Sequence, residues 1–143
     1  MRSVYATAAA MVAVLGVTAC GDGEPEVADI PYDQVRAAME GDAAAWRSYS
    51  SEIKGKTVRW TGRMVRAERV RGDDYVEEGE AYIDMDADGQ GSPAPDVVLQ
   101  IPVSQVDALN TPERPVTFRA TILGFVPAEG GQMIEMNLKE LAE

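Results

Sequence analysis

The sequence predicts a mainly β fold, a five-stranded barrel preceded by a short helical segment. Three observations support this prediction. Apolar and polar residues alternate along a long stretch that begins near residue 54, which is the period of a half-buried strand. Four shorter stretches of similar character follow, each bounded by turn-forming Gly, Pro, Asn or Asp residues. Apolar residues at helical spacing occur mainly before residue 54.

The composition limits both the fold and the chemistry. The chain has 143 residues, of which 45% are hydrophobic and 26% charged, and this suits one domain with one core. The absence of histidine excludes a histidine metal site, a Ser-His-Asp triad and a Cys-His dyad. A single cysteine excludes an intramolecular disulfide. The formal net charge of −11 disfavours nucleic acid as a partner, although a local basic patch can override the net sign.

The first residues predict an export signal. Arg2 gives a positive start, and the apolar run over residues 4–17 is too short to cross a bilayer comfortably. The run ends in Val17-Thr18-Ala19-Cys20. These four residues resemble a bacterial lipobox, which implies cleavage between Ala19 and Cys20 and acylation of the Cys20 thiol. Under this hypothesis residues 1–19 are a signal peptide, and an N-terminal lipid holds the protein at a membrane of the cell envelope.

The segment after the anchor is predicted to be a tether. Residues 20–29 are polar, contain Gly and Pro and show no periodicity, so the folded domain is expected to span residues 30–143. Gly21 follows the cysteine where some lipoproteins have Asp. By resemblance to enterobacterial sorting rules, this favours the outer membrane, facing the periplasm, in a cell with two membranes. The alternative, a plain signal peptide, would leave a free thiol outside the cytoplasm.

Two short helices are expected before the barrel. The first follows Pro31 and ends at Gly41, and Asp42 is a suitable N-cap for the second. The apolar positions at helical spacing are Val35 and Met39, followed by Ala43, Trp46, Tyr49 and Ile53. Trp46 and Tyr49 are expected to pack against the open end of the sheet, and the alternative is an aromatic platform for a ligand.

The long first strand is expected to bend at Gly62 after a Lys-Gly-Lys turn at residues 54–56, because glycine inside a strand often marks a bulge or corner. Its inward face carries Val58, Trp60 and Met64, and its outward face carries Arg59, Thr61 and Arg63. The later strands are expected at residues 81–86, 97–101, 116–125 and 133–138. Between the third and fourth we expect helical turns over residues 104–109, capped by Ser104, and the tail over residues 139–143 is expected to form another.

This order of elements resembles that of OB-fold barrels. The chain is similar to the OB-fold families of exported bacterial proteins, including those grouped as tRNA-anticodon-like. The resemblance covers roughly residues 42–141, and it is carried by residues 53–62, 97–101 and 116–124. It implies a binding barrel rather than an enzyme, and it carries no implication of RNA binding in an envelope protein.

Basic and acidic residues are segregated along the first two strands. Seven basic residues lie within positions 54–71, and eight acidic residues follow within positions 73–88. One interpretation is a set of cross-strand ion pairs that fix the register of a hairpin. The other is a basic outer face that binds an anionic polymer such as a nucleic acid, a glycan or phospholipid headgroups. The residues assigned to that face are Arg59, Arg63 and Arg119, together with the outward aromatic Tyr82.

An incomplete calcium motif lies in the loop after the second strand. Its alternating carboxylates are Asp84, Asp86 and Asp88. Gly89 follows as in the first half of an EF-hand loop, but the twelfth position is Pro95 rather than a bidentate Glu, with Asp96 adjacent. The motif therefore predicts at most a weak Ca²⁺ site, and the alternative is a solvated hairpin loop without a metal.

The function expected from these features is non-catalytic binding. We expect a lipid-anchored envelope lipoprotein whose barrel binds an anionic polymer or another envelope protein. The first alternative is a structural accessory subunit of an envelope complex, and the second is a weak calcium-binding module. No enzyme is expected, because nothing places two acids across a cleft and the serines lack a histidine base. No cofactor other than a weakly bound Ca²⁺ is expected.

Overall fold

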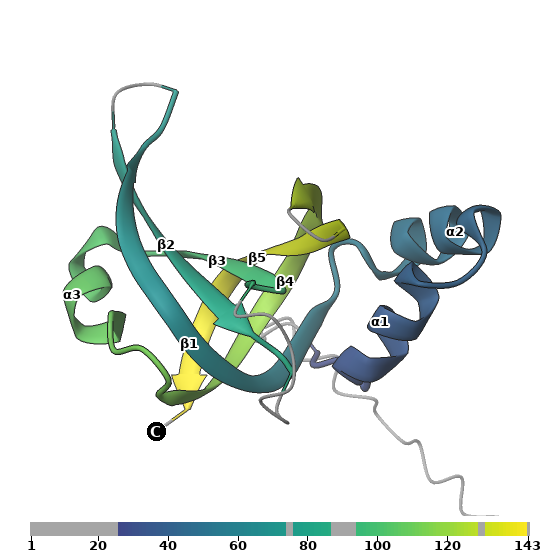
Figure 1. Ribbon diagram of the computed structural model, residues 1–143, viewed down its shortest axis with the longest axis horizontal. Coiled ribbons are helices and arrows are strands. Elements are labelled where there is room, and N and C mark those ends of the chain that lie inside the picture. Colours follow the sequence, from purple (N-terminus) through teal and green to yellow (C-terminus); the bar gives the residue numbers. More distant parts are fainter. Residues whose placement is uncertain (1–25, 74–75, 87–93, 129–130, 143) are drawn as a thin grey trace, which may run out of the picture.

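The structure is a computed structural model that describes residues 26–73, 76–86, 94–128 and 131–142. Its helices are α1 (Tyr32–Met39), α2 (Ala43–Ile53) and α3 (Val106–Leu109), the last preceded by a 3₁₀ turn, η1 (Val103–Gln105). Its strands are β1 (Thr57–Arg71), β2 (Glu77–Asp84), β3 (Val97–Ile101), β4 (Pro115–Ala128) and β5 (Gly131–Ala142). The prediction of a mainly β, five-stranded OB-like barrel preceded by a short helical segment is confirmed (Figure 1).

The five strands close on themselves in the order β1-β2-β3-β5-β4. Strand β1 makes this closure possible because it pairs with β4 from Thr57 to Arg63 and with β2 from Arg63 to Arg71. All neighbours are antiparallel except β3 and β5. The irregularity in β1 lies between Met64 and Arg66 rather than at Gly62. The predicted bend is therefore present as a strongly curved strand (Figure 1), and its bulge lies just beyond the glycine.

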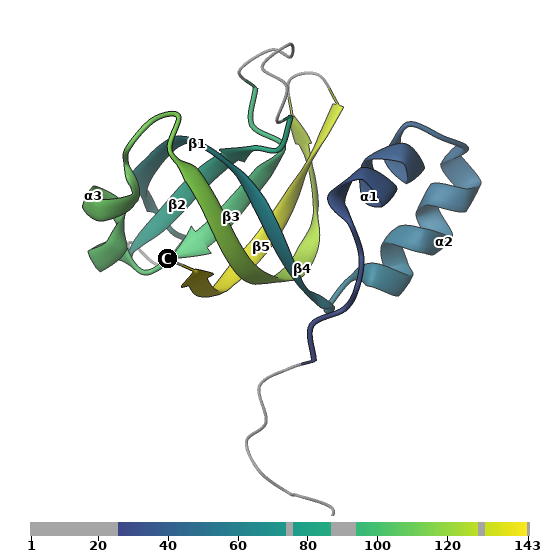
Figure 2. The same ribbon diagram turned by 90° about the horizontal axis from the view of Figure 1, so that it is seen from below.

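The predicted phase of β1 is confirmed, because Val58, Trp60 and Met64 are all buried in the core. Helices contribute core side chains at both ends of the barrel. Figure 2 shows α3 on one side of the barrel and α1 with α2 on the opposite side. From α1, Tyr32 and Val35 join the core cluster. The helical segment is thus a packed part of the domain rather than an appendage.

Specific contacts hold the helical segment against the barrel. The Asp42 side chain accepts a hydrogen bond from the Ala45 backbone N–H at 2.8 Å, which confirms the predicted N-cap of α2. The Trp60 indole N–H donates to the Ile30 carbonyl oxygen at 2.7 Å. The Tyr32 ring lies edge-on to Trp60 with ring centroids 5.5 Å apart. The Trp60 side chain therefore links the chain before α1 to the centre of the core.

Two local predictions were wrong. Ser104 lies inside η1 rather than capping a helix, because the turn begins one residue earlier, after Pro102. The tail after residue 138 continues β5 to Ala142 instead of forming a helical turn, since β4 supplies backbone partners as far as Ala142 opposite Thr117. Within the described ranges, no helix has the length and apolarity needed to span a bilayer.

Candidate functional site

The main candidate site is a pocket where the α1–α2 pair meets the barrel. Its volume is ≈ 490 Å³, within the range of roughly 300–1,000 Å³ usual for small-ligand sites. The side chains that give it chemical character are Tyr32, Arg36, Trp46, Asp86, Asp96 and Gln132. They come from both helices, from the two ends of the β2–β3 connection and from the start of β5. The pocket therefore depends on the docking of the helical segment.

Trp46 forms an aromatic wall of this pocket. Its ring lies edge-on to Phe125 of β4, with centroids 4.7 Å apart, and its indole N–H donates to the Gln132 side-chain oxygen at 3.1 Å. Tyr49 lies beside it with ring centroids 6.3 Å apart, and the Tyr49 hydroxyl accepts a hydrogen bond from Gln34 at 2.9 Å. The packing expected for this aromatic stripe is present. Trp46 remains partly exposed, so it is also available to a ligand.

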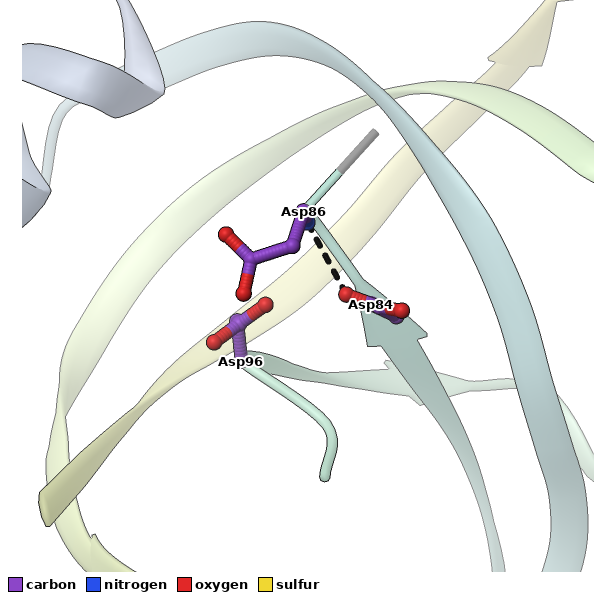
Figure 3. A group of neighbouring side chains, drawn as sticks. All are labelled: Asp84, Asp86 and Asp96. Atoms are coloured by element: carbon purple, nitrogen blue, oxygen red, sulfur yellow. Dashed lines mark hydrogen bonds between the residues drawn. The ribbon is translucent and has the colours of Figure 1, made fainter. Parts of the chain in front are cut away.

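Three carboxylates gather on the barrel side of the pocket. One oxygen from each of Asp84, Asp86 and Asp96 lies within 4.8 Å of the others (Figure 3). The Asp86 backbone N–H donates to Asp84 Oδ1 at 2.9 Å, and the Met85 N–H donates to Asp96 Oδ2 at 2.8 Å. These bonds fix the carboxylates at the end of β2 and just before β3. All three side chains are half-buried, so their mutual repulsion is only partly screened by water.

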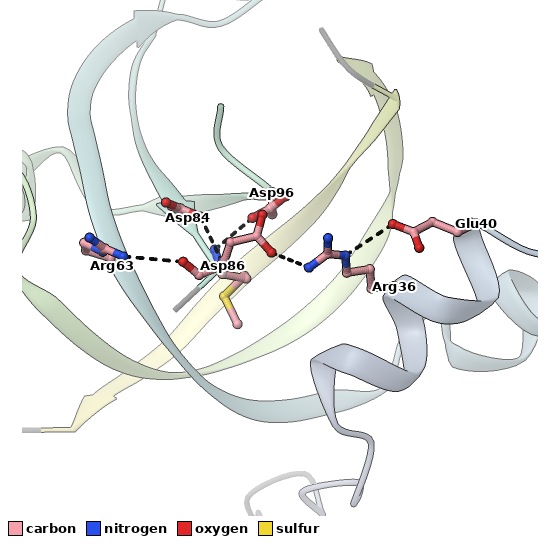
Figure 4. Close-up of polar contacts among 7 residues, drawn as sticks. Arg36, Glu40, Arg63, Asp84, Asp86 and Asp96 are labelled. Carbon is pink, nitrogen blue, oxygen red and sulfur yellow. Dashed lines mark hydrogen bonds and ion pairs between the residues drawn. The ribbon is translucent and has the colours of Figure 1, made fainter. Parts of the chain in front are cut away.

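A basic side chain from α1 partly neutralises this group. The Arg36 guanidinium forms a charge-assisted hydrogen bond with Asp86 Oδ1, and its Nε lies 3.3 Å from Glu40 Oε1 (Figure 4). From β1, Arg63 Nη2 donates to the Asp86 carbonyl oxygen at 3.4 Å. Arg36 thus ties α1 to the segment after β2. Three carboxylates and Glu40 still outnumber Arg36, so the pocket keeps an excess of negative charge when all are ionised.

Burial shifts the protonation of two pocket residues. It raises the pKa of Asp96 in spite of the hydrogen bond from Met85, and the negative charges of Asp86 and Asp84 raise it further. The pKa of the Tyr32 hydroxyl is also raised, first by burial and then by the nearby charge of Asp96, with which it forms a hydrogen bond. Asp96 therefore ionises less readily than an ordinary aspartate.

The carboxylate group differs from the predicted calcium ligands in one residue, because Asp96 rather than Asp88 lies with Asp84 and Asp86 in the described structure. Asp84 and Asp86 lie together as expected, whereas Asp88 lies outside the described residues. Asp96 completes the group, because β2 and β3 are paired and this pairing brings the two ends of their connecting loop together. Carboxylate oxygens suit a hard cation such as Ca²⁺. Arg36 already supplies a positive charge there, so the calcium interpretation stays a hypothesis.

The residues of the predicted basic face, Arg59, Arg63, Arg119 and Tyr82, contact different neighbours and do not form one group. Arg59 and Arg119 are directly opposite each other across β1 and β4, and Arg119 pairs with Glu140 at 3.2 Å. Arg63 is directed to the Asp86 carbonyl instead. The Arg66 guanidinium stacks over the Tyr82 ring, with Arg66 Cζ 4.0 Å from the ring centroid. The Tyr82 hydroxyl donates a hydrogen bond to Glu80. Burial, followed by that bond, raises the pKa of Tyr82.

The alternative interpretation, cross-strand charge pairing, is partly supported by the register. Arg71 faces Glu77 and Arg63 faces Asp84 across the hairpin, but Glu68 faces Glu80, a like charge. The ion pairs found around this hairpin are Arg66–Glu68 within β1 and Arg69–Asp107 to α3, with N···O distances of 3.6 and 2.9 Å. Among the described residues, no ion pair joins β1 to β2. Charge on this hairpin is therefore balanced mainly along β1 and toward α3.

Sequence reasoning missed part of this site. Arg36 and Glu40 carried only the ordinary spacing of a helical ion pair, and Gln132 carried no signal at all. The predicted cleavage and acylation residues, Ala19 and Cys20, lie outside the described part of the chain. Comparison with protein-family models, curated proteins and solved structures gave no significant match.

Proposed function

We propose that this chain is a lipid-anchored lipoprotein of the cell envelope that acts as a non-catalytic binding module. The observation that carries the binding role is the ≈ 490 Å³ pocket between the α1–α2 pair and the barrel. It combines one partly exposed aromatic side chain, Trp46, with convergent polar and charged groups that could orient a ligand. The anchor rests on the lipobox-like residues that end at Cys20.

Of the two ligand classes expected, an envelope protein is better supported than an anionic polymer. The pocket carries Glu40, Asp86 and Asp96 against Arg36, so it would repel a polyanion. On the barrel surface, Arg119 is already paired with a carboxylate. A polar or basic segment of a protein would complement the pocket, because its cationic groups would offset the excess of negative charge.

Site-specific photocrosslinking in cells tests this assignment. A photoreactive amino acid in place of Ala43, which lines the pocket, should form an adduct with one envelope protein that also binds the purified domain. The same replacement at Ala108, an exposed residue on α3 at the far end of the barrel, is the matched control. Identical adducts from both positions, or adducts with glycan alone, would contradict a protein ligand in this pocket.

The two alternatives have their own readouts. A stoichiometric complex that survives detergent and high salt would identify a structural accessory subunit. Weak calcium binding should raise the melting temperature at millimolar CaCl₂ in the wild-type chain but not in an Asp84→Asn, Asp96→Asn double variant. An unchanged wild-type melting temperature would remove the calcium hypothesis.

A further inference from the structure

The described chain begins beside the start of β1. Val27 forms an isolated parallel bridge with Thr57, and the Ala28 N–H donates to the Thr57 carbonyl oxygen at 2.7 Å. Glu26 lines a shallow groove together with Gly55 and Lys56. The predicted tether therefore ends against the turn that leads into the barrel, and not at the pocket.

That turn presents basic side chains on a fixed backbone. Gly55 has φ +87°, which favours glycine, and its N–H donates to the Ile122 carbonyl at 2.8 Å, while the Ile122 N–H donates to the Lys56 carbonyl at 2.9 Å. Lys54, Lys56 and, two residues into β1, Arg59 are exposed. In the described part of the chain these three cations form no salt bridge.

The arrangement around Arg59 concentrates positive charge further. Arg59 faces Arg119 directly across β1 and β4, an arrangement of like charges that is unfavourable without a nearby anion. Glu140 partners Arg119, and Glu26 and Glu52 are acidic neighbours of the turn. Basic side chains therefore gather at the turn in a chain whose formal net charge is −11, and the sequence that leads to it also carries Asp22, Glu24 and Asp29.

The position of the predicted anchor brings this surface close to a bilayer. Cys20 precedes Glu26 by six residues, and a fully extended chain of that length spans roughly 20 Å. In Figure 2 the described chain enters at the bottom beside the start of β1, whereas the start of β5, which borders the pocket, lies at the top. An N-terminal lipid would hold the basic turn toward the headgroups and leave the pocket on the opposite side.

We propose that the basic turn surface, formed by Lys54, Lys56 and Arg59, docks on the anionic phospholipid headgroups of the membrane that holds the lipid. Lysine and arginine near such a surface bind the phosphate-rich layer electrostatically. Docking fixes the orientation of the domain, so that the pocket faces away from the membrane. This inference uses the proposed anchor for orientation only, because the surface itself is part of the described domain.

Vesicle binding by the mature chain with Cys20→Ser tests the surface without any lipid anchor. The chain should partition onto vesicles of phosphatidylcholine with about one-third phosphatidylglycerol, and salt should release it. Lys54→Gln, Lys56→Gln and Arg59→Gln together should lower the partition coefficient at least tenfold. The matched control removes the same charge at the other end of β1, with Arg66→Gln, Arg69→Gln and Arg71→Gln, and should change binding less than about twofold.

Two results would overturn the proposal. One is equal binding of the wild-type chain to anionic and neutral vesicles, and the other is an equal loss of binding in both triple variants, which would reflect net charge alone. Amine-reactive labelling of the wild-type chain gives a readout that needs no basic-surface substitution. Anionic vesicles should protect Lys54 and Lys56 from labelling, and unchanged labelling of both would also overturn it. Failure of acylation at Cys20 is measured separately, by metabolic labelling with a fatty acid.

Discussion

Alanine at Gly62 should destabilise the barrel, because this glycine is closely packed against β2. A Cβ atom at this position would lie 2.4 Å from Ile83 Cγ2, 2.7 Å from Met85 Sδ and 2.9 Å from the Asp84 carbonyl oxygen. The two side chains can rotate away at some cost. The carbonyl oxygen belongs to β2, so it can move only if the β1–β2 pairing shifts.

The expected cost follows from this overlap. Extra atoms in a packed core typically cost 1–3 kcal/mol, and a clash with a paired backbone belongs at the upper end, so we expect about 2–3 kcal/mol for Gly62→Ala. For a domain of this size that corresponds to a fall in melting temperature of about 10 °C. Urea unfolding followed by far-UV circular dichroism gives the free energy, and a thermal scan gives the temperature.

Gly124 provides the matched control. It also lies within a strand, β4, but a Cβ atom there would have no neighbour within 4 Å. Gly124→Ala should therefore leave the free energy of unfolding within about 0.5 kcal/mol or raise it slightly, because alanine has less backbone freedom in the unfolded chain. A Gly62→Ala variant as stable as wild type, or equal losses for both variants, would refute the packing of the bend described above.

Three further predictions concern the core, the pocket and the anchor. Trp60→Ala should cost about 3–5 kcal/mol in the same unfolding assay because the ring is buried, whereas Trp60→Phe should cost less and lose mainly the bond to Ile30. The raised pKa of Asp96 means that the folded state holds this proton more tightly, so the contribution of Asp96 to the free energy of unfolding should fall as the pH rises above about 4. Asp96→Asn should reduce that fall in urea titrations between pH 4 and 7, and an unchanged slope would contradict it. Cys20→Ser should move the protein from the membrane pellet to the soluble fraction, and retention in the pellet would contradict the lipid anchor.

Local chemistry was enough to predict most elements of the fold. The alternation around Trp60 gave the phase of β1, and the Asp42 cap gave the start of α2, because both signals lie within a few residues. The ends of β4 and β5 were underestimated. The end of β4 and the start of β5 pair with each other through the backbone as far as Ala128 opposite Gly131. Such backbone pairing does not depend on side-chain alternation.

The candidate site was harder to predict because its parts are distant in sequence. The spacing of Asp84 and Asp86 in the sequence predicted that they would lie together. Asp96 joins them only through the register of β2 with β3. Arg36 reaches Asp86 across 50 positions of the chain. Outward phase alone grouped Arg59, Arg63 and Arg119, and the register places Arg59 opposite Arg119 across β1 and β4. The outward phase could not reveal that Arg63 would be directed to the Asp86 carbonyl.

Closure of the barrel also affects how this protein can meet a partner. Because β1 pairs with both β2 and β4, every described strand has a neighbour on each side over part of its length. An accessory subunit that docks by adding a strand would be confined to segments with one unpaired edge, such as residues 123–128 of β4, which lie beyond its pairing with β1. Helical elements contribute core side chains at both ends of the barrel. Side-chain surfaces remain, and the pocket beside Trp46 and Arg36 is a hollow bordered by both the helices and the barrel. The closed topology and this pocket together support the proposed binding role.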